Sequence, residues 1–146
     1  MNGLMSFLDG QKANGYLILR LVAGILLAWH GYAKLFEFGI SGVEGYFQSI
    51  NLPGAVVLAP LVSVLEFFGG IAIILGILTR LLGIWMIVQF GLIVIWVKPM
   101  LMAKGFSGEG GSEIDLLLFA AGIMLATAGP GIAALGPKFL KQRWAQ

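Results

Sequence analysis

The sequence predicts an all-α integral membrane protein: a four-helix bundle with a short interfacial helix between its first and second spans. Three observations support this fold class. Apolar residues make up 59% of the chain and charged residues only 11%, whereas a soluble domain carries roughly a quarter charged residues. The mean hydropathy is +0.96. Four apolar stretches also approach the ~20 residues that a helix needs to cross a bilayer, so a soluble globular domain is excluded.

The whole chain, 1–146, is expected to form one transmembrane domain. Its spans are predicted at 15–36, 55–78, 80–102 and 113–129. Between the first two spans, Tyr46, Phe47 and Ile50 recur at helical spacing among glycines. This pattern is typical of a short amphipathic helix that lies at the membrane interface.

The later connections follow from local signals. Thr79-Arg80 is expected to form a tight turn, so that the second and third helices make an antiparallel hairpin. The glycine-rich stretch 104–112 predicts a loop. Glu113 and Asp115 come directly after it, and acidic residues are favourable in the first turn of a helix because they complement its dipole. The fourth helix is therefore expected to begin there.

Basic residues indicate the orientation of the chain. Four spans place both termini on one side of the membrane, together with the predicted turn. Six basic residues are expected on that side and three on the other: Lys12, Arg20, Arg80, Lys138, Lys141 and Arg143 against Lys34, Lys98 and Lys104. By the positive-inside rule, both termini are predicted to be cytoplasmic in the cytoplasmic (inner) membrane of a prokaryote.

Composition also limits the chemistry. A formal net charge of +2 is too small to indicate nucleic-acid binding, which needs a strongly basic surface. Cysteine is absent, which excludes a structural disulfide and a thiolate metal site. The single histidine cannot build a bis-histidine haem within one copy, and no flavin, nucleotide or metal motif is present.

Every ionisable residue within the spans calls for an explanation, because charges near the bilayer centre are unfavourable by a few kcal/mol. Three of them are candidates for a functional centre. His30 and Lys34 lie in the first span, and Glu66 lies near the middle of the second. Depth along antiparallel helices places Glu66 and His30 at nearly the same height, so the natural partners of Glu66 are His30 and Lys34. Two interpretations stay open: a structural buried pair, or a pair that handles protons or binds a ligand.

Further residues could bind a ligand, and all of them except Arg20, which lies towards the cytoplasmic side, are expected in the non-cytoplasmic half. They are Arg20, Trp29, Phe67, Gln89, Trp96, Glu113 and Asp115. Each has a structural alternative. The arginine could contact lipid headgroups, the glutamine could form an interhelical hydrogen bond, the two acids could cap a helix, and the aromatic residues could simply pack.

Several motifs in order resemble the DoxX family. They are Arg20-Leu21 followed by WHGYAKL at 29–35, LEFFGG at 65–70 with LGILTR at 75–80, EIDLLL at 113–118, and Gly-Pro-Gly at 129–131. The likeness covers 17–131. It implies a four-helix protein of the bacterial or archaeal cytoplasmic membrane. Members of the family have been linked to thiosulfate:quinone oxidoreductase subunits, to membrane oxidoreductase complexes and to oxidative-stress handling.

The function expected from this resemblance and from the polar residues is that of a quinone- or quinol-interacting subunit of a membrane oxidoreductase. His30 would hydrogen-bond a quinone oxygen, Glu66 would relay a proton, and Lys34 would hold the pair electrostatically. Trp29, Phe67 and Trp96 would line the slot. Electrons would have to pass through the bound quinone or through the cofactor of a partner protein.

Two other functions stay open. The chain could be a non-enzymatic membrane scaffold that recruits a soluble redox partner through 104–112 or the tail 138–146. It could also be a small-solute transporter with Glu66 as the coupling carboxylate. Four helices are few for alternating access by one chain, so a transporter would need a homo-oligomer.

Overall fold

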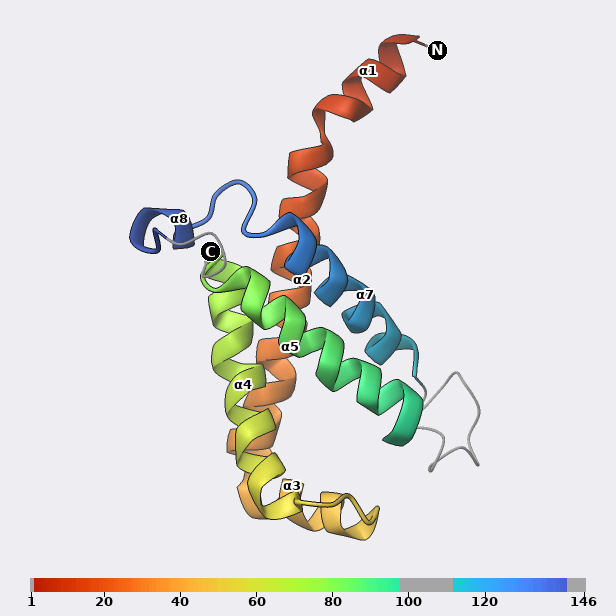
Figure 1. Ribbon diagram of the computed structural model, residues 1–146, viewed down its shortest axis with the longest axis vertical. Helices are drawn as coiled ribbons and strands as arrows, with labels where there is room; N and C mark the ends of the chain where they lie inside the picture. The colour runs from red at the N-terminus through yellow and green to blue at the C-terminus, as the bar shows by residue number, and fades with distance from the viewer. Residues whose placement is uncertain (1, 98–111, 142–146) are drawn as a thin grey trace.

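The computed structural model describes residues 2–97 and 112–141, and these residues are helical apart from short links (Figure 1). The predicted all-α class is confirmed. Four long helices coincide with the four apolar stretches of the sequence: α2 (Lys12–Tyr32), α4 (Ala55–Leu75), α5 (Thr79–Leu92) and α7 (Glu113–Ala128).

Two of these helices continue as a turn of π-helix, α2 into η1 (Ala33–Glu37) and α5 into η2 (Ile93–Val97). Three rods, 12–37, 55–75 and 79–97, are long and apolar enough to cross a membrane. With 16 residues, α7 rises only ~24 Å, so a fourth crossing stays a prediction. The part of the third predicted span after residue 97 lies outside the described residues.

The long helices pack as two close pairs, α2 with α4 and α5 with α7, and contacts between the pairs are fewer. Glycines allow this close approach. A methyl group at Gly70 would collide with the backbone of Ala28, and one at Gly83 would lie 2.5 Å from the backbone nitrogen of Ala126. Small residues are the usual means of close helix packing in membranes. The buried core includes Leu27, Ile73, Met86 and Leu125.

The link between α4 and α5 lies three residues earlier than predicted. Gly76 ends α4 in the left-handed conformation with φ +68°, and α5 begins at Thr79. Glycine adopts this conformation without the steric strain of a Cβ atom. The glycine therefore determines where the chain turns, and Thr79 and Arg80 already belong to the next helix.

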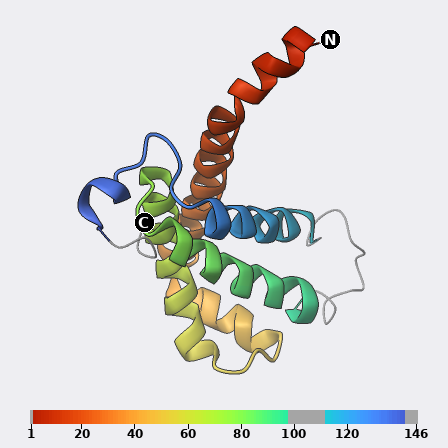
Figure 2. The ribbon, with the colours of Figure 1, turned by 45° about the horizontal axis from the view of Figure 1, so that its top comes forward.

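The shorter helices lie at the two ends of the molecule. Helix α3 (Gly39–Ser49) packs on α4, which confirms a helix between the first two spans; its place at the membrane interface stays a prediction. Helix α1 (Asn2–Gly10), which the sequence did not predict, projects from the opposite end, where α8 (Gly136–Phe139) also lies (Figures 1 and 2).

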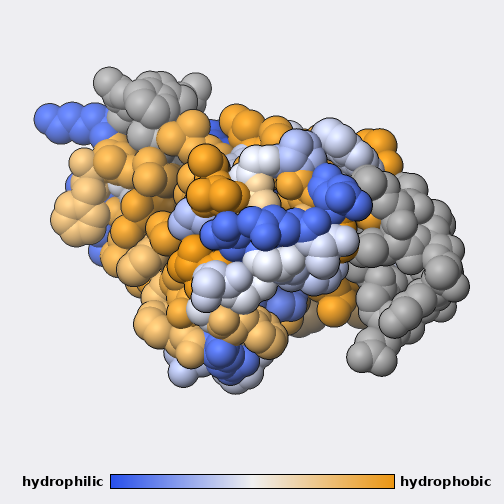
Figure 3. Space-filling model, turned by 90° about the horizontal axis from the view of Figure 1, so that it is seen from below, coloured by the Kyte–Doolittle hydropathy of each residue, from blue (hydrophilic) through white to orange (hydrophobic). Residues whose placement is uncertain are grey.

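Apolar side chains project outward from every long helix, as at Ile25, Val57, Ile84 and Leu117. Figure 3 looks onto the end that carries α3, and hydrophilic residues cross the middle of that face with apolar residues beside them. An apolar outer surface of this kind is what a lipid environment requires, because lipid chains then solvate the exposed residues.

Candidate functional site

The candidate site is centred on Glu66, near the middle of α4, whose side chain is only 3% exposed. A buried carboxylate is strongly unfavourable unless it is paired and hydrogen-bonded. Glu66 has both kinds of partner. One oxygen, Oε2, forms an ion pair with Nζ of Lys34, and the other, Oε1, accepts a hydrogen bond from Nε2 of Gln89 at 2.6 Å. Three helical segments therefore meet at one carboxylate.

Lys34 reaches Glu66 from η1, the π-helical turn that directly follows α2. Such wide turns often occur at functional sites, because they redirect side chains. One turn earlier, a methyl group at Gly31 would collide with the backbone of Phe67, so this glycine lets α2 lie directly against α4 beside Glu66. Lys34 is 24% exposed. It is thus the member of the pair that an outside molecule can reach.

Gln89 brings α5 into the site. Its side chain is buried, and its hydrogen bond to Glu66 joins one helix pair to the other. The carbonyl oxygen Oε1 of Gln89 has no hydrogen-bond partner among the described residues. A buried acceptor without a partner is unfavourable by about 1–3 kcal/mol. The site therefore retains one open hydrogen-bonding position next to the carboxylate.

A pocket of about 420 Å³ lies beside the ion pair. Its lining residues are apolar or aromatic except for one lysine, and are Lys34, Phe38, Gly42, Val43, Tyr46 and Phe47. An apolar cavity of a few hundred Å³ with one polar group is the usual form of a small-molecule site. The sequence indicated a helix here, but it could not indicate that the helix faces Lys34.

His30 lies outside this network. Its side chain is partly buried and makes no hydrogen bond or ion pair within the part of the chain that the structure describes. Of the two partners expected for Glu66, the structure therefore brings Lys34 to the carboxylate and leaves His30 apart.

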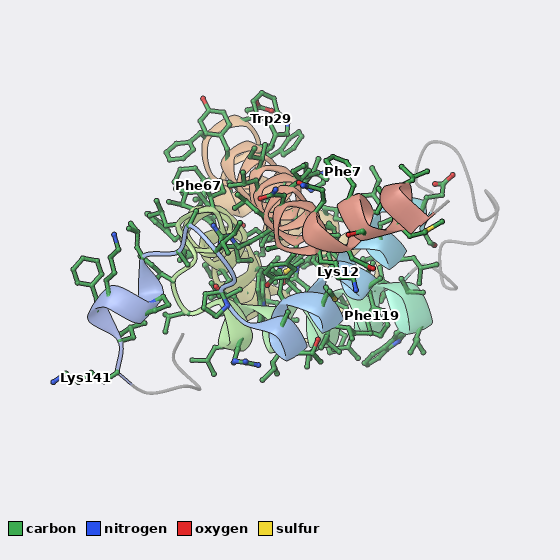
Figure 4. The ribbon with its side chains drawn as sticks, turned by 90° about the horizontal axis from the view of Figure 1, so that it is seen from above. Phe7, Lys12, Trp29, Phe67, Phe119 and Lys141 are labelled. Atoms are coloured by element: carbon green, nitrogen blue, oxygen red, sulfur yellow. The ribbon has the colours of Figure 1, made fainter. Side chains whose placement is uncertain are left out.

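Trp29 and Phe67 belong to an aromatic cluster on the outer side of α2 and α4, with neighbouring ring centroids 5.0–6.4 Å apart. Figure 4 shows both residues on the side of the molecule away from Phe119 of α7. They line a separate apolar groove of about 320 Å³ between the two helices. Neither residue lines the pocket that contains Lys34.

The remaining candidates lie elsewhere. Trp96 is half exposed on η2, and Glu113 and Asp115 are partly buried in the first turn of α7. The hydrogen bonds described for Glu66 involve none of these three residues. The loop considered as a partner-binding segment, 104–112, lies outside the described residues except for Ser112, and so does the tail after residue 141.

Arg20 differs from the expectation that it contacts lipid headgroups. It is 1% exposed, and its guanidinium donates hydrogen bonds to one backbone carbonyl at the end of α4 and to three in the segment that follows α7. The acceptors belong to Ile74, Pro130, Ile132 and Ala133. The last carbonyls of a helix have no partners within the helix. Arg20 supplies such a partner for Ile74, and its other three hydrogen bonds hold the segment after α7 against α2.

Two further residues of this kind were not identified from the sequence. The hydroxyl of Tyr16 donates to the carbonyl of Gly129, and Arg80 donates to those of Ala126 and Thr127, both at 2.8 Å. With Arg20 they form what we term the carbonyl-binding cluster: Tyr16, Arg20 and Arg80. Basic side chains interact favourably with the C-terminal ends of helices. The Gly-Pro-Gly sequence after the last helix marks such an end, and it was the signal in the sequence that could have indicated these contacts.

No group of three or more His, Cys, Asp or Glu residues that could hold a metal ion is found in 2–97 and 112–141. What these ranges contain instead is a set of long apolar helices, packed through glycines and enclosing an ion pair. These features define a small helical membrane protein.

Comparison with known proteins gives the family. The sequence profile of the DoxX family matches residues 15–99, and the chain belongs to this family. It is 33% identical over 127 residues to a Bacillus subtilis (strain 168) protein named "Putative oxidoreductase CatD", covering 87% of this chain and 88% of that protein.

Two other relatives are named as membrane proteins. The inner membrane protein YqjF of Escherichia coli (strain K12) is 29% identical over 130 residues, covering 89% of this chain and 95% of that protein. The uncharacterized membrane protein Rv3486 of Mycobacterium tuberculosis is 28% identical over 143 residues, covering 92% and 87%. No solved structure matches the chain.

Proposed function

We propose that this DoxX-family protein is a quinone- or quinol-interacting subunit of a membrane oxidoreductase. One observation carries the proposal: Lys34 lines an apolar pocket and also forms the ion pair with the buried carboxylate of Glu66. The name of the Bacillus subtilis relative supports an association with redox chemistry. The proposal gives the hydrogen-bonding role to Lys34 rather than to His30, because Lys34 belongs to both the pocket and the ion pair.

The pocket suits an aromatic headgroup with oxygen acceptors. Phe38, Tyr46 and Phe47 offer aromatic faces, and Lys34 offers the charged donor. A quinone bound there would take up two electrons and two protons on becoming a quinol. Lys34 is the group that donates a hydrogen bond or a proton to the acceptor oxygen.

In this proposal, Glu66 and Gln89 position Lys34 and support its proton transfer. The carboxylate holds the ammonium in place through the ion pair. When Lys34 donates one proton to the reduced quinone, Glu66 can take up one proton from water, so that the pair again has no net charge. The second proton of the quinol would also come from water. The free carbonyl oxygen of Gln89 can then accept a hydrogen bond from the protonated carboxyl group, after the amide turns.

Electrons would come from a partner protein, because the sequence contains no motif for a redox cofactor. We place the protein in the cytoplasmic membrane with all four long helices crossing it, both termini in the cytoplasm and α3 at the opposite interface. Fusing a fluorescent protein that matures only in the cytoplasm to the C-terminus tests this orientation. Fluorescence is expected, and its absence from a fusion that is present in the membrane overturns the orientation.

The binding test uses protein purified in a mild detergent with native lipid, and measures bound quinone by extraction and absorbance. Stoichiometric quinone is expected in the wild type and in Lys12→Met, which removes a lysine of an exposed surface pair. Most of it should be lost in Lys34→Met. Wild type without quinone, under conditions that retain it in a known binder, overturns the proposal.

A second variant separates binding from chemistry. In Glu66→Gln the pocket lining is unchanged, so added quinone should still bind, but proton-coupled turnover with the partner oxidoreductase should fall. A scaffold would tolerate this change. A transporter would instead move protons and solute in liposomes without any redox substrate.

A further inference from the structure

Helix α1 exposes an unusual amount of apolar surface for a segment outside the main bundle. Its four large apolar side chains, Leu4, Met5, Phe7 and Leu8, are 50–63% exposed. The helix projects from the end of the molecule that carries α8 (Figures 1 and 4). Within the described residues it contacts only the start of α2 to any extent.

These side chains lie on one face. At 100° per residue, Leu4, Met5, Phe7 and Leu8 fall within an arc of roughly 160°. Ser6 lies opposite the centre of that arc, and Asp9 lies outside it. Helix α1 is therefore amphipathic, with an apolar face that no other part of the described structure covers.

The joint between α1 and α2 lies directly before the first candidate span. Gln11 interrupts the helix with φ −94° and ψ 0°, and the Asp9–Lys12 ion pair, at 3.0 Å, bridges the interruption on the surface. Charged groups of this kind suit the headgroup region. The rod 12–37, which is long and apolar enough to cross a membrane, begins there.

We propose that α1 is a membrane-surface helix that binds the phospholipid bilayer, with Leu4, Met5, Phe7 and Leu8 inserted at the boundary between headgroups and acyl chains. A short amphipathic helix next to a span is well suited to this position, because its apolar face enters the bilayer while its polar face stays in water. The proposal does not depend on quinone binding.

A second copy of the chain fits the face less well. Helix α1 has 9 residues and is only ~13 Å long. Two such faces cannot bury the ~1,200 Å² that a stable specific interface requires. The bilayer, in contrast, is continuous with the surroundings of α2 and needs no matching surface.

The chain has no cysteine, so single-cysteine spin labels test the proposal directly. Leu4→Cys and Leu8→Cys report on the apolar face, and Ser6→Cys is the matched control on the opposite face. All three positions are exposed, so labelling leaves the bundle undisturbed. The labelled proteins are placed in nanodiscs of phosphatidylethanolamine and phosphatidylglycerol, and their collisions with oxygen and with a water-soluble nickel chelate are compared.

The ratio of oxygen to nickel accessibility is expected to be several-fold higher at residues 4 and 8 than at residue 6, because oxygen concentrates in the bilayer and the chelate stays in water. An equal ratio at all three positions would place α1 in water and overturn the proposal. So would dipolar broadening at residue 8 that disappears on dilution with unlabelled chain, since this would identify a second copy as the partner.

Discussion

Two polar clusters lie along the rod formed by α2 and η1, and each compensates a basic side chain in a different way. Near the start of α2, Arg20 is buried on backbone carbonyls. Just beyond the end of α2, in η1, Lys34 pairs with the buried side chain of Glu66. The two basic residues are 14 positions, or ~21 Å, apart along the helix. Both are compensated by oxygen atoms, but only one set of oxygens belongs to a titratable group.

This difference indicates a structural role for the first cluster and a chemical role for the second. The carbonyls that Arg20, Arg80 and Tyr16 contact do not exchange protons. The carbonyl-binding cluster therefore ties the end of α7 and the segment after it to α2, α4 and α5. Glu66 can exchange a proton, and its partner lines a pocket. We therefore expect substitutions in the first cluster to affect stability, and substitutions in the second to affect binding and turnover more strongly than stability.

The largest effect is expected for Arg20→Met. It leaves one buried and three partly buried carbonyls without this donor, so the free energy of unfolding should fall by about 3 kcal/mol or more. Reversible unfolding in mixed micelles, followed by tryptophan fluorescence, measures this change. Lys12→Met is the control and should stay within about 0.5 kcal/mol of the wild type. Equal stability of the two variants would contradict a structural role for Arg20.

Gly31→Ala tests the helix contact beside Glu66. The added methyl group collides with the backbone of Phe67, which should destabilise the protein by about 1–3 kcal/mol and weaken quinone binding by moving η1. Gly45→Ala is the matched control, because nothing lies within 4 Å of a methyl group there. If both variants behave alike in the unfolding and quinone-binding measurements, α2 and α4 do not pack as described.

A double-mutant cycle of Lys34→Met and Glu66→Gln measures the ion pair. Either change alone leaves one partner uncompensated, whereas the double variant removes both charges. The coupling energy should be about 0.5–3 kcal/mol, measured by the same unfolding method. Strictly additive effects would show that the pair contributes nothing to the fold.

Tyr16→Phe should have a smaller effect in the carbonyl-binding cluster. It removes one hydrogen bond, to the carbonyl of Gly129, and should lower the free energy of unfolding by about 1 kcal/mol while leaving bound quinone unchanged. Tyr32→Phe is a suitable control on the exposed aromatic cluster. A loss of quinone in Tyr16→Phe would break the distinction between the two clusters.

The smallest effect is expected for His30→Ala. Since its side chain makes no hydrogen bond or ion pair within the described residues, stability should change by about 0.5 kcal/mol at most, and the quinone content should match the wild type. Loss of quinone in this variant, with Lys34→Met unaffected, would return the donor role to the histidine.

Much of the fold could be predicted because it depends on local properties of the chain. The length and apolarity of each stretch determined the four long helices, and the spacing of Tyr46, Phe47 and Ile50 indicated α3. The link at Gly76 was predicted three residues too late. The chain is rich in glycine, and the sequence does not show which glycine adopts the left-handed conformation. Helix α1 was missed because its amphipathic pattern is only 9 residues long.

The candidate site was only partly predictable. Glu66, Lys34 and Gln89 were all identified from their polarity within apolar helices, since a buried polar group needs a partner wherever the chain places it. The sequence did not indicate which hydrogen-bond or ion-pair partner each of these side chains has. Helical periodicity places His30 and Lys34, four residues apart in the first span, on nearly the same face and does not choose between them.

By itself, then, the amino-acid sequence determined that this chain is a helical membrane protein of the DoxX family, with a carboxylate buried in its second long helix. Only the tertiary structure decided that Lys34 and Gln89 meet that carboxylate, that α3 completes a pocket beside it, and that Arg20 is buried on carbonyls. The physical reason is that these contacts depend on how close the helices approach and how they are rotated. Glycine contacts at Gly31 and Gly70 and the π-helical turn η1 set both quantities, and they act only once the helices have packed.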